Sequence, residues 1–297
     1  LDMETNLYFP QVHCNALDLQ FNFGQNPYRF TPPDGYKSVC LSNISDPATV
    51  RSDHYVGITT WSGEFTGNAG TLRQMPLKFQ PDFVWIKQRN QAYSTGHQLY
   101  DSVRGAGAEK EINSSGDANE GAGNIETYGW LNSFDAQGGF TTKGGSTDSD
   151  YVNRTGVDYV AWCWKAGGNK GTWNVDDVGY DTVAKAGLDG GSINPSGASV
   201  NTKAGFGIYK YEGNGGSSQT IAHGLPKRPS LIMIKRLEGG SGNTGDWMVG
   251  SDSILENTLA SNWGYYMVLN KNQARANDFA PFGTPTSMEI KFVTESI

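Results

Sequence analysis

Two stretches of the chain carry the same pattern of apolar residues and glycines. YVGITTWSGE occupies residues 55–64, and FGIYKYEGNG occupies residues 206–215. Further along, PDFVWIK at 81–87 corresponds to PSLIMIK at 229–235, and TGHQLYDS at 95–102 corresponds to TGDWMVGS at 244–251. Three matches in the same order are the signature of a duplicated structural unit, because chance rarely preserves both order and spacing.

The shared segments have the character of β-strands. They are short runs of β-branched and aromatic residues bounded by Gly and Pro, as strands and their turns require. The chain has 39 glycines and 12% aromatic but only 18% charged residues, which suits a turn-rich protein better than a helical bundle. The sequence predicts an all-β fold of tandem β-sandwich domains, jelly-roll or concanavalin-like, with long Gly-rich loops. Little helix is expected, because only SILENTLAS at 253–261 and HQLYDSV at 97–103 have helical spacing.

The repeats define the expected domain organisation. The first repeat spans residues 41–168, a linker or connecting-strand region spans 169–204, and the second repeat spans 205–297. The second repeat is expected to be incomplete, because it has no counterpart of DYVAWCW at 158–164. Within the first, residues 105–127 are rich in Gly, Ala, Asn, Ser and Glu, which predicts an exposed loop.

Both ends of the chain fall inside strand-like patterns. The chain starts within an apolar pattern and stops directly after the alternating residues 289–292. We therefore expect it to be a segment of a longer polypeptide. An intact mass of only 32.2 kDa for the native protein would contradict this expectation.

Charge and hydropathy exclude two classes of partner. The chain has 23 basic and 30 acidic residues, a net charge of −7, and no block of Lys and Arg. It therefore lacks the electrostatic footprint of a nucleic-acid-binding protein. It also has no apolar run of about 18 residues and no signal-peptide pattern, so membrane insertion is not expected.

Cysteine and histidine show no ligand or disulfide pattern. The cysteines Cys14, Cys40 and Cys163 are far apart and form no CxxC motif. Cys163 alternates with Trp162 and Trp164 along a strand, which predicts a buried small residue rather than a nucleophile. The histidines stand singly, without metal-binding spacing, and are expected in turns or at the surface: His13, His54, His97 and His223.

Two loops and several tryptophans could contact a ligand. DAQGG at 135–139 and STDSD at 146–150 have clustered oxygens that suit calcium, but they lack the twelve-residue calcium loop, so ordinary turns are favoured and ion binding is left open. Trp130, Trp173 and Trp263 lie in polar, Gly-rich surroundings and could stack on sugar rings. The tryptophans inside apolar strands are expected in the core: Trp85, Trp162 and Trp164.

No enzyme motif is present. The sequence has no GxSxG elbow, P-loop or dinucleotide-binding fingerprint in the required strand-then-helix context, and it singles out no pair of carboxylates. No catalytic residue, cofactor or metal is predicted, and the protein is not expected to be an enzyme.

The first forty residues resemble part of a known domain. NLYFPQV at 6–12 and LDLQFNFGQNPYRF at 17–30 resemble the last strands of a SPRY domain, a concanavalin-like β-sandwich. The matching positions are held by Pro10, Val12, Asn22, Phe23, Gly24 and Pro27, while Tyr28 stands where Phe is usual. The resemblance implies that residues 1–40 are the C-terminal strands of a SPRY-like sandwich.

Residues 55–297 resemble a domain found in structural proteins of tailed bacteriophages, especially marine ones. The motifs are PDFVWIKQRN, HQLYDSVRGAG, SFDAQGGFTT and YVAWCWKAGG in the first repeat, and AGFGIYKYEGNG, IAHGLPKRPSLIMIKR and DWMVGSDS in the second. The resemblance implies a virion protein: a tail fibre or surface appendage that displays loops for host attachment or joins virion parts. A capsid decoration or head-fibre protein is the alternative, followed by a glycan-degrading depolymerase. The implied partners are other virion proteins, copies of the chain itself as a homo-oligomer such as a trimer, and a host surface glycan.

Overall fold

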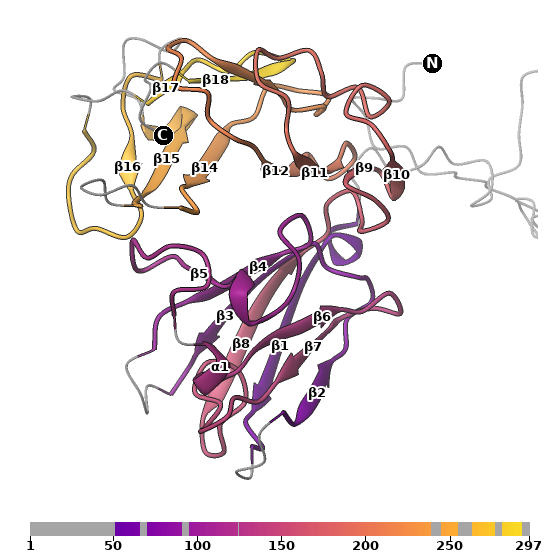
Figure 1. The fold of residues 1–297 in the computed structure, drawn as a ribbon, viewed down its shortest axis with the longest axis vertical. Helices are drawn as coiled ribbons and strands as arrows, with labels where there is room; N and C mark the ends of the chain where they lie inside the picture. The colour runs from indigo at the N-terminus through magenta and orange to yellow at the C-terminus, as the bar shows by residue number, and fades with distance from the viewer. Residues whose placement is uncertain are drawn as a thin grey trace, which may run out of the picture. The chain divides into compact units, whose positions relative to one another are not determined.

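The computed structural model describes residues 51–65, 70–90, 95–123, 125–238, 245–254, 263–276 and 281–292. In these residues the chain forms five β-sheets, a single four-residue helix, α1 (Ile125–Tyr128), and short 3₁₀ turns (Figure 1). The predicted all-β class is therefore confirmed. The SPRY-like strands predicted within residues 1–40 lie outside the described residues.

One of the two helix predictions, that for residues 97–103, is wrong. Residues 98–101 form strand β4 (Gln98–Asp101), and all four side chains are buried. Leu99 packs on one side of the sheet and Tyr100 on the other, which a strand buried on both faces allows. In the other expected helix only a 3₁₀ turn, η4 (Asp252–Ile254), is described; residues 255–261 lie outside the described residues.

The first repeat supplies all the strands of a five-stranded antiparallel sheet. Its strand order is β1 (Val56–Ser62), β8 (Asp158–Trp164), β3 (Phe83–Gln88), β4, β5 (Ile112–Asn113). β8 comes last in sequence yet lies between β1 and β3. The predicted strands at 55–61, 82–89 and 158–164 are thus confirmed, and their pairing depends on contacts between distant parts of the chain.

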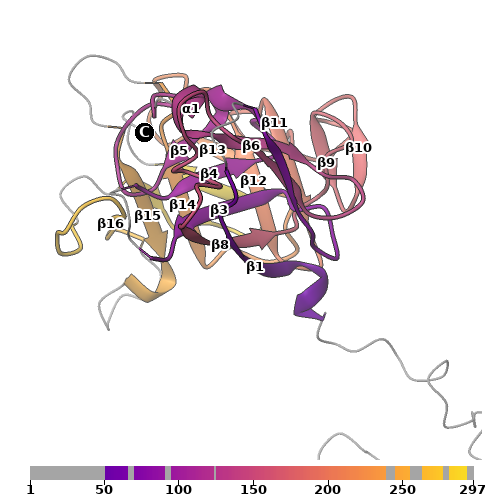
Figure 2. The same ribbon diagram turned by 90° about the horizontal axis from the view of Figure 1, so that it is seen from below.

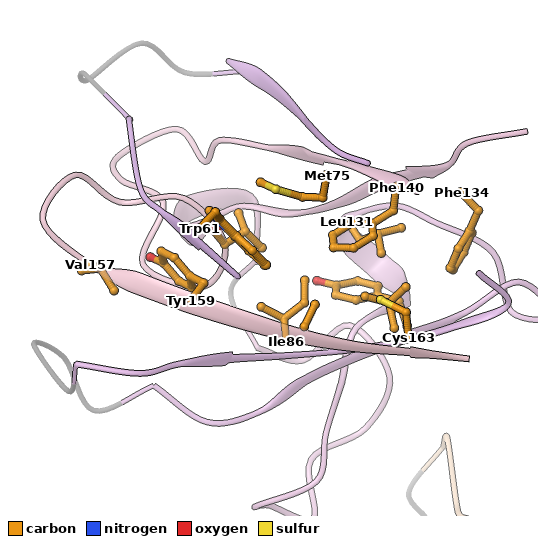
Figure 3. Close-up of a cluster of buried hydrophobic side chains, with 13 residues drawn as sticks. Trp61, Met75, Ile86, Leu131, Phe134, Phe140, Val157, Tyr159 and Cys163 are labelled. Atoms are coloured by element: carbon orange, nitrogen blue, oxygen red, sulfur yellow. The ribbon is translucent and has the colours of Figure 1, made fainter. Parts of the chain in front are cut away.

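The inner face of this sheet packs against a second sheet, ordered β2 (Leu72–Met75), β7 (Phe140–Lys143), β6 (Trp130–Phe134). Figure 3 shows Met75, Leu131 and Phe140 of this sheet directed toward Ile86, Tyr159 and Cys163 of the other. The turn between β6 and β7 requires glycine: Gly139 has φ +90°, and a Cβ there would lie 2.0 Å from the Met75 carbonyl oxygen.

The expected connecting region contributes three strands to a sheet. The strand order is β10 (Val178–Tyr180), β9 (Trp173–Val175), β11 (Gly197–Asn201), β12 (Phe206–Lys210), and β9 and β11 are parallel. Leu188, Ala198 and Val200 form its buried centre. β12 is the strand predicted from FGIYK.

The rest of the described chain forms two three-stranded sheets. One has the order β14 (Leu231–Lys235), β15 (Trp247–Ser251), β16 (Met267–Val268), which lie side by side in Figure 2. The other has the order β13 (Thr220–Ala222), β18 (Glu289–Phe292), β17 (Phe282–Gly283). Both contribute to a core that includes Ile232, Trp263 and Phe282.

The duplication is visible as two three-stranded units, β3–β4–β5 and β14–β15–β16. Val84 pairs with Tyr100 in the first unit, and Ile232 pairs with Gly250 in the second. Ser102 N donates to Asp82 O at 2.8 Å, and Asp252 N donates to Ser230 O at 3.1 Å. The third strand of each unit also pairs antiparallel with the second, an equivalence that the sequence comparison did not reveal.

The lysine that ends each matching run has the same role. Lys87 Nζ donates to Thr95 O at 2.8 Å, and Lys235 Nζ donates to Gly245 O at 2.6 Å. Thr95 is therefore equivalent to Gly245, one position beyond the Thr244 that the sequence comparison aligned with it. The loop between the first two strands of the unit is one residue longer in the second repeat than the sequence alignment implies. Strand pairing therefore shifts the alignment by one position.

Candidate functional site

A polar cavity lies beside β5. Its volume is about 410 Å³, and its lining includes Thr95, Glu111, Asn113, Ser115, Asp117 and Tyr151. Glu111 and Asn113 are positioned by β5, which pairs with β4, while the others lie on loops. Since ligand pockets usually measure about 300–1,000 Å³, the cavity is large enough for a small molecule.

Glu111 is the most unusual group in this cavity. Its residue surface is only 2% exposed. Its carboxyl lies against Gly123, where a Cβ would come within 2.7 Å of Oε2. In the part of the chain that the structure describes, no donor forms a hydrogen bond with this carboxyl. A buried carboxyl without donors is costly to ionise, so this group is suited to binding something that supplies them.

Burial sets the protonation of Glu111. Loss of hydration raises the pKa of Glu111 to about 7, while the charges of Arg104 and Lys235 act in the opposite direction. Both cations have closer partners. Arg104 contacts Asp101 at 2.5 Å and Glu120 at 3.1 Å, and the Lys235 ammonium donates to backbone carbonyls. Glu111 therefore changes charge near neutral pH.

The other polar groups of the cavity include both donors and acceptors. Thr95 Oγ1 is buried and has no hydrogen-bond partner. The Tyr151 hydroxyl already donates to Gly123 O at 2.8 Å, and Asn113 Oδ1 accepts from Ser115 N at 2.8 Å. Asp117 adds an exposed carboxylate. The two carboxyl groups of the lining, Glu111 and Asp117, can accept hydrogen bonds from a ligand that carries donors.

Sequence reasoning missed this site because it predicted an exposed loop over 105–127. That prediction is wrong at the centre of the segment, where Glu111, Ile112 and Ser114 are buried. Ile112 packs with Leu99 and with Trp247, a residue far away in sequence. One isolated Ile in a polar stretch has no periodicity, so no local signal could have placed it.

The histidines occupy three different environments. His54 is exposed in the turn η2 (Ser52–His54), and half-buried His97 accepts a hydrogen bond from Trp85 Nε1 at 2.7 Å. His223 is 0% exposed, which corrects the expected turn or surface position. Its Nδ1 accepts from Leu225 N at 3.0 Å, which leaves the proton on Nε2, 3.2 Å from Thr286 O. His13 lies outside the described residues.

The two oxygen-rich loops use their oxygens internally. Asp135 accepts from Ser133 Oγ at 2.7 Å and from Thr141 Oγ1 at 2.8 Å. In the second loop, Asp148 and Asp150 pair with Arg154 at 3.4 and 2.5 Å. Over the described ranges, no group of three or more His, Cys, Asp and Glu residues is placed to hold a metal.

The predicted sugar-stacking tryptophans are not exposed. Trp263 is 1% exposed and donates to Asp252 Oδ1 at 3.1 Å, so it belongs to the core and corrects the prediction. Trp130 and Trp173 are half-buried. Trp85, Trp162 and Trp164, expected in the core, are half-buried on the face of the five-stranded sheet opposite Cys163.

Cys163 is buried as predicted, and burial raises the pKa of its thiol. Its neighbours in the core are apolar side chains such as Val84. A thiol held in its neutral form is a poor nucleophile. Cys14 and Cys40 lie outside the described residues.

Comparison with known proteins gives one match. No curated protein and no solved structure matches the chain. Within the described residues, no helix has the length and apolar character needed to cross a membrane. Residues 52–296, which include both three-stranded units and the strands between them, match the family described as a domain of unknown function, DUF7483, and the chain therefore belongs to that family.

Proposed function

We propose that the chain is a structural component of a tailed-bacteriophage virion, built from tandem β-sandwich domains of the jelly-roll or concanavalin-like type. It would form part of a tail fibre or surface appendage that joins virion parts or displays loops to the host. The sequence resemblance to phage structural proteins supports the setting. The observation that carries the joining role is an apolar sheet face, covered in the first three-stranded unit and exposed in the second.

In the first unit, the face opposite the core is covered by the second repeat. This outer face presents Phe83, Trp85, Leu99 and Ile112, which pack with Leu237 and Trp247. Trp247 also donates from Nε1 to Asn113 O at 2.9 Å. One repeat thus stabilises the other by burying large apolar side chains, each contributing about 1.5–3 kcal/mol when fully buried.

The equivalent face of the second unit is exposed. Strand pairing places Leu231, Met233, Val249 and Met267 at the positions of Phe83, Trp85, Leu99 and Ile112. Leu231 is 54% exposed, Met233 42% and Met267 44%. We name this the open face. Contiguous apolar surface of this kind typically marks a contact with another protein, and we assign it to a neighbouring copy of the chain.

Self-association through the open face is expected to depend on Met233. Met233→Lys places a charge at its centre and is expected to weaken association at least tenfold, because the apolar contact is lost and the ammonium is desolvated. Sedimentation equilibrium measures this. Val178→Lys is the matched control, since Val178 is 49% exposed on a different sheet. A monomeric wild type, or equal association of both variants, would contradict the assignment.

The position in the virion is tested on purified particles. Antibodies against the chain, labelled with gold, are expected to decorate the tail or an appendage. Label over the capsid surface would instead support the decoration or head-fibre alternative. Particles that carry no label, while the intact chain is detected elsewhere in infected cells, would overturn the proposal.

One observation favours a second candidate, the glycan-degrading depolymerase. Glu111, with a pKa raised to about 7, lies in the same cavity as the carboxylate of Asp117. A carboxylic acid that keeps its proton near neutral pH is what a glycosidase needs as a general acid. Release of reducing sugar from host polysaccharide by the wild type but not by Glu111→Gln would support this candidate. The structural proposal expects no release from either protein.

A further inference from the structure

We propose that the Glu111 cavity binds a small, neutral, hydroxyl-rich ligand, a single saccharide unit, whose hydroxyl groups donate to the Glu111 carboxylate. This inference goes beyond the proposed structural role. It rests on the geometry of the cavity alone, so it can hold or fail wherever the chain resides.

The cavity needs donors that the described protein residues do not supply. Glu111 is 2% exposed, and no described group donates to its carboxyl. Thr95 Oγ1, in the same lining, is also buried without a partner. Most buried polar groups in proteins are hydrogen-bonded, so a carboxyl without a donor in the lining of a cavity points to a ligand or bound solvent that completes it.

The charge of the surroundings disfavours an anionic ligand. The two ionisable acids of the lining, Glu111 and Asp117, disfavour an anion. Lys235 acts on the Glu111 carboxyl as a positive charge, whereas Arg104 is paired with Asp101 and Glu120, so a cation is the competing ligand and is included in the test below. Hydroxyl groups supply short-range donors without adding charge. Donation to an ionised acceptor is roughly twice as strong as a neutral hydrogen bond.

The volume and the remaining lining can accommodate a sugar ring. The volume of about 410 Å³ exceeds that of a few water molecules, each occupying about 30 Å³ in the liquid. Tyr151 contributes an aromatic ring, which can pack against the C–H face of a sugar. Asn113, Ser115 and Thr95 contribute further polar atoms around it.

Binding is measured on the full 297-residue chain. The sugars are D-glucose, D-galactose and N-acetyl-D-glucosamine, titrated at pH 8.5 and pH 5.5 with saturation-transfer NMR as the readout. Methylammonium and acetate are titrated as a cation and an anion. At pH 8.5 we expect at least one sugar to bind, neither ion to bind, and Glu111→Gln to weaken the sugar about tenfold or more, as loss of a hydrogen bond to a charged group should.

The pH dependence provides a second readout. Lowering the pH protonates Glu111, so wild-type affinity is expected to fall at pH 5.5 toward that of Glu111→Gln, whose own affinity stays constant. Besides Asp117 of the lining, the charged and titratable groups around Glu111 are Arg104, Lys235, Tyr100 and Tyr151. The pKa values of both tyrosines are raised, and the pKa of Lys235 is lowered by burial. Because all five remain in the variant, comparison with it isolates Glu111.

Two further variants separate binding from folding. A Cβ at Gly116 would meet no atom within 4 Å, so Gly116→Leu adds an apolar side chain to the lining and should abolish binding while preserving the melting temperature. Glu109→Gln, an exposed acid outside the lining, should bind like the wild type. The proposal would be overturned by any of three results: no sugar binding, sugar binding that is unchanged in Glu111→Gln and Gly116→Leu, or preferential binding of methylammonium.

Discussion

Glu111→Gln is expected to raise the free energy of unfolding at pH 8 by up to about 3 kcal/mol. Burial raises the folded-state pKa of Glu111 from 4.5 to about 7. The folded protein therefore holds a proton on Glu111 that the unfolded chain releases between these pH values. The stabilisation from this proton is fully present below pH 4.5, declines as the pH rises and is lost above about pH 7. Gln remains neutral throughout and avoids this loss.

Urea unfolding of wild type and variant at several pH values between 4 and 8 measures the effect. The two proteins should have similar stability at pH 4 and diverge as the pH rises. Glu109→Gln is the control, because Glu109 is exposed and should give the same pH dependence as the wild type. If Glu111→Gln were less stable than the wild type at pH 8, a hydrogen-bond donor from the protein or from solvent would have to stabilise the Glu111 carboxylate. The account of the cavity would then be wrong.

Asp82→Ala is expected to destabilise the protein by at least about 2 kcal/mol, because it leaves buried donors without an acceptor. Asp82 is 0% exposed. Its Oδ2 accepts from Ala166 N at 2.8 Å and Gly168 N at 3.2 Å. Its Oδ1 accepts from the hydroxyls of Ser102 at 2.7 Å and Ser199 at 3.2 Å. One carboxyl thus ties together segments that follow β4 and β8 with a residue of β11.

The substitution series tests whether these hydrogen bonds cause the effect. Asp82→Asn should cost less than Asp82→Ala, because Asn keeps one oxygen for the two backbone donors and serine hydroxyls can accept from its amide. Ser199→Ala should cost less again, since it removes one hydrogen-bonded group. Asp181→Ala is the control, because Asp181 is exposed and pairs only with Lys185 at the surface. Equal unfolding midpoints for Asp82→Ala and Asp181→Ala in guanidinium would contradict the role assigned to Asp82.

Local sequence predicted three strands of the first repeat, β1, β3 and β8. Alternation of side chains places Trp61, Tyr159 and Cys163 on the inner face of one sheet, and this pattern is visible in the sequence because each strand has one face in the core. The duplication was visible for the same reason: PDFVWIK and PSLIMIK keep the residues that pair in β3 and β14. HQLYDSV was misread as helical because a strand buried on both faces has no alternation.

The buried polar residues could not be placed from the sequence. Trp263 follows polar residues in the chain and His223 stands between Ala222 and Gly224, yet both are buried through contacts with residues distant from them in sequence, such as Phe282 and Met288. The position of Glu111 depends on the next residue, Ile112, which packs with Trp247 of the second repeat. Side-chain type alone does not indicate such contacts.

The sequence by itself determined the β-rich class, the positions of the main strands and the existence of two related units, because these depend on local alternation and turn chemistry. The tertiary structure decided that β8 lies between β1 and β3, that the connecting region forms its own sheet with β12, and that the outer face of one unit is covered while the other is exposed. It also decided the protonation of Glu111. Strand pairing, burial and electrostatic environment all depend on residues brought together from distant positions, and no local pattern encodes those distances.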